Sequence, residues 1–137
     1  MNLITLTMLV IGVSSSVFPT LAGAQTVQCV LTHSASADVK PDRQLDVHAR
    51  TEDNLTATLV GLGSQTAYVT FDSDPSRYTL MFRKDNADAF FYEQDAYADG
   101  IIYWVYFKRS RTVTYAKLRA FPLTGAPSSY LMLGLCK

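Results

Sequence analysis

The sequence predicts an all-β protein, and most economically a small antiparallel up-and-down β-barrel of about eight strands that a disulfide closes. Short runs of β-branched and aromatic residues recur along the chain between turn residues. No helical period of useful length follows residue 25. The only two cysteines, Cys29 and Cys136, lie near opposite ends of the chain. A β-sandwich is the alternative architecture.

The N-terminal 24 residues have the pattern of a secretory signal peptide. Residues 1–24 contain no charged side chain, and an apolar run over 3–13 is followed by Ala22-Gly23-Ala24, a small-x-small cleavage pattern. This run is shorter than the ~20 apolar residues that span a bilayer. We therefore expect a signal peptide over 1–24 and one domain over 25–137, secreted or periplasmic, with no stable membrane insertion after cleavage.

Export gives the two cysteines a predicted role. In an oxidising compartment a pair of cysteines in a small domain is expected to form a disulfide, here Cys29–Cys136. The bond would place the first and last strands side by side. A meander whose first and last strands meet is a closed barrel without free edges.

The strands follow one another at short intervals. Turn-rich segments such as GLGSQ (61–65) and KRSR (108–111) separate them, which favours antiparallel hairpins between neighbours. The expected strands are 26–33, 44–50, 55–60, 66–72, 77–83, 89–94, 101–107, 112–120 and 129–136.

One strand alternates cleanly and another does not. In 44–50, Leu45, Val47 and Ala49 share one face and polar residues share the other. In 101–107 (IIYWVYF) both faces are apolar, so the pattern leaves open which face lies inside.

The turn at 108–111 predicts the register of this hairpin. It sets Trp104 opposite Tyr115, Tyr106 opposite Val113, and Ile102 opposite Lys117. The opposite side mixes large and small apolar groups, as an interior does, and we expect it to be the core. Its residues are Ile101, Tyr103, Val105, Phe107, Thr114, Ala116 and Leu118.

The preceding hairpin extends this interpretation. A turn at Asp85-Asn86 would place Leu80 and Phe82 in the core together with Phe91 and Ala89. The outer face would then carry aromatic residues fringed by basic ones, the composition of protein interfaces. Ordinary cross-strand pairs under basic stems, or a cover formed by 34–43, are the alternatives. The predicted binding residues are Trp104, Tyr106, Tyr115, Phe90, Tyr92, Arg83, Lys117 and Arg119.

Composition and motifs exclude several classes of function. Twelve basic and twelve acidic residues disfavour nucleic-acid binding and polybasic membrane binding. The two histidines stand apart, no glycine-rich phosphate loop occurs, and GLGSQ lacks the glycine of a nucleophile elbow. The acidic residues between 85 and 99 could form a glycosidase-like pair but are typical of solvated turns. We expect no metal, no cofactor and no catalytic residues.

The general form resembles the periplasmic lysozyme inhibitors in small size, signal peptide, barrel-like strand pattern and terminal cysteines. The nearest stretch to that family's Ser-Gly and Lys-Gly motifs, SRYTLMFRKDNADAFF, has no glycine, so no residue roles are transferred. We expect a non-enzymatic binding protein with a protein partner, in an inhibitor or immunity-type role. The alternative is a lipocalin-like carrier of a small apolar ligand inside the barrel. Large inward groups would favour the first, and the expected ones are Tyr78, Phe82, Phe91, Tyr103 and Phe107.

Overall fold

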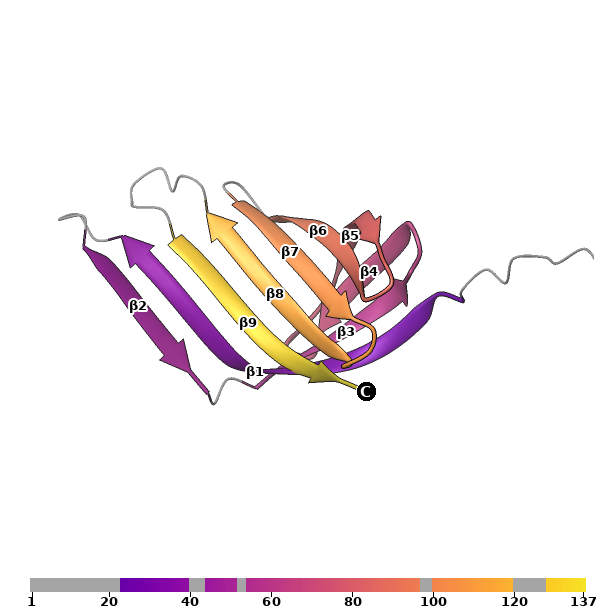
Figure 1. Ribbon diagram of the computed structural model, residues 1–137, viewed down its shortest axis with the longest axis horizontal. Coiled ribbons are helices and arrows are strands. Elements are labelled where there is room, and N and C mark those ends of the chain that lie inside the picture. Colours follow the sequence, from indigo (N-terminus) through magenta and orange to yellow (C-terminus); the bar gives the residue numbers. More distant parts are fainter. Residues whose placement is uncertain (1–22, 40–43, 52–53, 97–99, 120–127) are drawn as a thin grey trace, which may run out of the picture.

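The computed structural model describes residues 23–39, 44–51, 54–96, 100–119 and 128–137, so the signal peptide predicted over 1–24 lies almost wholly outside the described residues. The described part is all-β, as predicted, and forms a single antiparallel sheet (Figure 1). Its strands are β1 (Gln25–Val39), β2 (Leu45–Arg50), β3 (Leu55–Leu62), β4 (Thr66–Phe71), β5 (Asp74–Asp85), β6 (Ala89–Ala96), β7 (Gly100–Phe107), β8 (Thr112–Arg119) and β9 (Ser128–Cys136).

Eight of these strands close into a barrel. From β3 to β9 each strand pairs with the next, and β1 pairs with both β3 and β9. Cys29 lies directly opposite Cys136 in the β1–β9 ladder, and the two form a disulfide. The predicted up-and-down barrel and its disulfide are therefore confirmed.

The ninth strand extends the sheet beyond the barrel. The first half of β1 pairs with β3, whereas Ser34–Val39 pairs with β2 along the same edge. Along the other edge, Ser34 to Asp38 pair with β9. Residues 34–39 therefore continue β1 instead of covering a sheet face, since pairing on both edges satisfies their backbone groups. The barrel is splayed at this end, where β2, β1, β9, β8 and β7 lie side by side (Figure 1).

A glycine permits the bend in β1. Gly134 of β9 lies opposite Leu31, next to an irregularity in the ladder between Leu31 and His33. A Cβ atom at position 134 would lie 2.5 Å from the carbonyl oxygen of Val30 and 2.9 Å from the Cα of Leu31. Only glycine allows the two backbones to approach this closely.

The register predicted for the β7–β8 hairpin is confirmed, but the predicted outer face is the inner one. Trp104 lies opposite Tyr115, and Tyr106 lies opposite Val113. Trp104 and Tyr92 are each 1% exposed. The indole Nε1–H of Trp104 donates a 2.8 Å hydrogen bond to Oε1 of buried Gln94. The expected interior residues Ile101, Tyr103, Phe107 and Leu118 are instead exposed.

The β5–β6 hairpin differs from the prediction because it contains a bulge. The ladder shifts register between Phe82 and Lys84, so Phe82 lies opposite Tyr92 and packs against the core, as does buried Leu80. An extra residue in one strand reverses the alternation beyond it. Phe90 therefore points inward and is buried, whereas Phe91 is only half-buried, contrary to the expected assignment.

Candidate functional site

The splayed end of the barrel carries a concave groove. Three depressions of about 260, 310 and 330 Å³ adjoin there, and Tyr130 lines all three. The groove spans the inner faces of β1, β2, β8 and β9 and the nearby ends of β3 and β4. Its lining residues are Ser34, Ser36, Asp38, His48, Arg50, Asn54, Leu55, Phe71, Tyr115, Lys117, Arg119, Ser128, Ser129, Tyr130 and Met132.

Strand register brings the polar side chains of the groove onto one face. Ser36 lies opposite His48 of β2 on one side and opposite Tyr130 of β9 on the other. Tyr130 in turn lies opposite Lys117 of β8. Because directly opposed residues point to the same side of a sheet, four strands contribute adjacent side chains to one surface.

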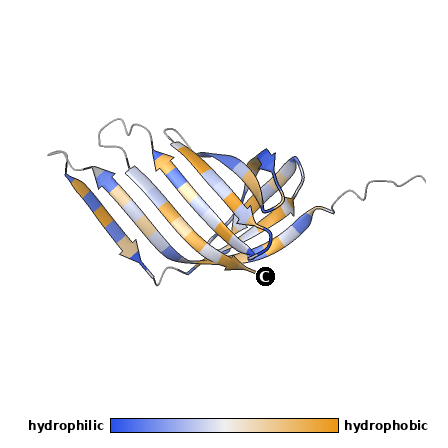
Figure 2. Cartoon of the chain, viewed as in Figure 1, coloured by the Kyte–Doolittle hydropathy of each residue, from blue (hydrophilic) through white to orange (hydrophobic). Residues whose placement is uncertain are grey.

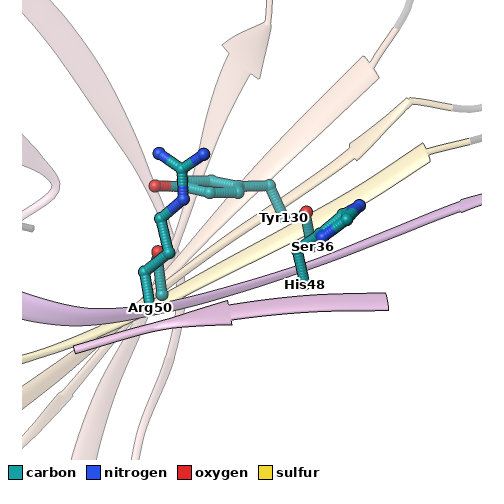
Figure 3. Close-up of a pocket in the computed structure, with 5 residues that line it drawn as sticks. Ser36, His48, Arg50 and Tyr130 are labelled. Carbon is teal, nitrogen blue, oxygen red and sulfur yellow. The ribbon is translucent and has the colours of Figure 1, made fainter. Parts of the chain in front are cut away.

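Arg50 reaches across this surface. Figure 3 shows its side chain rising from β2 toward the phenol ring of Tyr130, with Ser36 and His48 beside them. Nε2 of His48 lies 3.2 Å from the Asp46 carboxylate on the same strand. The Arg50 guanidinium provides a cationic donor at this end of the groove.

The opposite end of the groove has two further cations. Partial burial, together with the charge of neighbouring Arg119, lowers the pKa of Lys117 below its usual value. Among the described residues, no carboxylate lies within ion-pair distance of Arg50, Lys117 or Arg119. The groove therefore presents cations that form no ion pair with a carboxylate of the described chain, although Asp38 lines the same depression as Lys117 and Arg119.

Aromatic rings connect the groove to the core. The rings of Tyr115 and Trp104 pack edge to face with their centroids 4.9 Å apart. The rings of Tyr115 and Tyr130 pack in the same way with their centroids 6.3 Å apart. The Phe71 ring, at the end of β4, packs against Trp104 with the ring centroids 6.0 Å apart. Burial raises the pKa of the Tyr115 phenol. The floor of the groove is therefore fixed by core packing rather than by mobile surface chains.

The structure brings together only part of the predicted binding face. Tyr115, Lys117 and Arg119 line the groove, and Trp104 supports it from beneath.

The remaining predicted residues lie elsewhere. Phe90 and Tyr106 stack in the interior near the β7–β8 turn, and the Tyr92 hydroxyl accepts a 2.8 Å hydrogen bond from the Gly63 amide. Exposed Arg83 is paired with Glu93 at 2.9 Å on the outer side. These four residues do not line the groove.

Of the lining residues, only Tyr115, Lys117 and Arg119 belong to the predicted binding set. The most important residues that sequence reasoning missed are His48, Arg50 and Tyr130. Part of the signal was present, because the alternation over 44–50 already placed His48 and Arg50 on the polar face of one strand. No local pattern shows that this face meets Tyr130, since the contact requires β1 to lie between β2 and β9.

Neither a metal-binding cluster among the described residues nor a similar known protein indicates what the groove binds. Within the ranges that the structure describes, no group of three or more His, Cys, Asp or Glu side chains could hold a metal ion. The described residues also include no helix long and apolar enough to cross a membrane. Comparison with protein-family models, with curated proteins and with solved structures finds no match.

Proposed function

We propose that this protein is a secreted or periplasmic, non-enzymatic binding protein that holds an acidic segment of a partner protein in the concave groove. The observation that carries the proposal is the grouping of three cations, Arg50, Lys117 and Arg119, with the rings of Tyr115 and Tyr130. Tyrosine and arginine are enriched at the centres of interfaces because they bury much area at a low cost in side-chain entropy. The proposed binding surface has the aromatic and basic composition predicted from the sequence, but it lies on the concave side of the sheet instead of the outer side.

The charges of the groove favour an acidic partner. An arginine guanidinium binds a carboxylate through two parallel hydrogen bonds, which gives both strength and orientation. Ser36 and Tyr130 place hydroxyl groups in the same depression as Arg50, where they are available as further donors. Asp38 also lines the groove, at the end near Arg119, and would disfavour carboxylates placed directly beside it.

The filled barrel interior favours a protein partner over a small apolar ligand. Trp104, Tyr92, Leu31 and Leu59 are each at most 1% exposed and belong to one continuous core. An eight-stranded barrel holds a ligand only where its inward side chains leave space. Of the five large inward residues expected from the sequence, Tyr78 and Phe82 pack against this core. Tyr103 and Phe107 are exposed, and residues of similar size such as Trp104 and Tyr92 fill the interior instead.

Export is supported by two independent features. The uncharged leader has the pattern of a signal peptide. The Cys29–Cys136 disulfide is typical of proteins in oxidising compartments.

A pair of matched charge reversals tests the proposal. Arg119 lines the groove, whereas Arg109 is exposed in the turn between β7 and β8. The immobilised protein is used to capture partners from its own envelope or medium. Any captured protein is then titrated against the wild type, Arg119→Glu and Arg109→Glu.

The proposal expects Arg119→Glu to weaken binding about tenfold or more and Arg109→Glu to leave it nearly unchanged, with wild-type binding falling as salt rises. A partner that binds Arg119→Glu as tightly as the wild type would contradict a role for the groove.

A further inference from the structure

The outer, convex surface of the sheet is apolar over one group of neighbouring strands and polar over the others. Ten large hydrophobic side chains are exposed among the described residues, and all ten lie on β2, β1, β9, β8 and β7. These strands are consecutive neighbours in the sheet, and apolar residues recur along them (Figure 2). We call their outer surface the convex patch. Leu131, Leu133 and Leu135 of β9 form its centre.

Register joins these residues into one surface. Leu131 lies opposite Ala116 on one side and opposite Ala35 on the other, and Ala35 lies opposite Ala49. The described outward positions of the five strands include no Lys, Arg, Asp or Glu.

The outer surface of the other half of the barrel is different. Arg83 pairs with Glu93 there, and the Arg77 guanidinium lies 4.9 Å from the centre of the Tyr68 ring. The described outward residues of β3 and β4 are mostly threonines. Apolar surface is therefore segregated to one side, which burial against a partner explains and random exposure does not.

The area of the convex patch suits a stable protein interface. The ten side chains are between 37% and 72% exposed. If a fully exposed side chain of this kind presents roughly 150–200 Å², the patch offers on the order of 800 Å². A standard interface buries about that area on each partner.

We propose that the convex patch is the interface between two copies of this chain. An uncharged apolar surface is complementary to itself, and a two-fold axis would bury the same residues on both copies. Two such sheets would pack face to face, as the sheets of a sandwich do. A lipid surface fits less well, because proteins that lie on membranes usually add basic residues, which this patch lacks. The concave grooves would face away from the interface, so the inference is independent of the proposed function.

Analytical ultracentrifugation of the exported, disulfide-bonded protein tests this inference. At micromolar concentration the wild type should sediment with twice the mass of one chain. Leu133→Arg places a charge at the centre of the patch, where Leu133 is 48% exposed, and should raise the dimer dissociation constant at least about tenfold. Leu118→Arg, on β8, should weaken the dimer in the same way. It replaces Leu133→Arg as the test variant if Leu133→Arg folds poorly.

Thr79→Arg is the matched control, because Thr79 is an exposed residue on β5, in the polar half. It should remain a dimer.

A wild type that stays monomeric up to about 100 μM would overturn the inference, since a Kd above that value is too weak for a stable interface. So would folded Leu133→Arg and Leu118→Arg variants that remain dimeric. Monomeric wild type that co-sediments with phosphatidylcholine vesicles would assign the patch to lipid instead.

Discussion

Replacing Trp104 by alanine tests which face of β7 lies inside the barrel. Trp104 is 1% exposed and contacts the rings of Tyr115 and Phe71. Removing a buried tryptophan side chain usually costs about 3–5 kcal/mol of folding free energy, through lost burial and the cavity that remains. Domains of this size have about 5–15 kcal/mol in total. Trp104→Ala should therefore lose a large part of its stability.

A second variant separates packing from hydrogen bonding. Trp104→Phe keeps an aromatic ring but removes the indole donor that bonds to Oε1 of Gln94 at 2.8 Å. A buried acceptor left without its donor costs about 1–3 kcal/mol. Trp104→Phe should thus fall between the wild type and Trp104→Ala.

Urea unfolding followed by far-UV circular dichroism is the appropriate assay, because Trp104 is the only tryptophan and its fluorescence disappears in both variants. Tyr68→Ala is the control, since Tyr68 is half-buried on the outer side, where its stacking with Arg77 contributes about 0.5–1 kcal/mol. If Trp104→Ala loses less than about 1 kcal/mol, the indole is exposed and the assignment of inner and outer faces is wrong.

Two further predictions concern the closure of the barrel and a carboxylate. Reduction of the Cys29–Cys136 bond, which joins residues 107 positions apart, should lower the free energy of unfolding by about 4–5 kcal/mol in the chain-entropy model, and an unchanged urea midpoint in dithiothreitol would refute this. The Tyr78 hydroxyl and the Ser76 amide donate hydrogen bonds to the Asp74 carboxylate, which holds its pKa below 3.8. The ionised carboxylate therefore stabilises the fold at pH values above its unfolded pKa. This stabilisation is lost as the pH falls through the folded pKa. Tyr78→Phe should raise the pKa of Asp74 toward 3.8, as measured by NMR titration, and an unshifted pKa would show that the hydroxyl does not hold the carboxylate.

The positions of the strands were predictable because they depend on local chemistry. Residues 101–107 are all large apolar or aromatic, and KRSR supplies the turn that sets Trp104 opposite Tyr115. The Cys29–Cys136 pair followed from the inferred compartment and from the cysteine count, and with it came the closure of the barrel.

Which face lies inside could not be predicted, because alternation determines which residues share a face but not the direction in which a sheet curves. Both faces of β7 are apolar, since one lines the core and the other lies in the convex patch. Lys117 and Arg119 suggested an outer face, yet they are inner residues at the splayed end, where the barrel opens to solvent.

The concave groove also depends on tertiary structure. Arg50 and Tyr130 lie close together only because β1 lies between their strands. The bend in β1 is possible because Gly134 of β9 lies opposite it. The sequence alone determined the strands, the register of the β7–β8 hairpin and the disulfide, since these follow from neighbouring residues and from cysteine chemistry. It did not determine the register of the β5–β6 hairpin, which contains a bulge. The curvature and the long-range pairing of β1 decided what is core, what is groove and what is exposed, because they join residues that no local pattern relates.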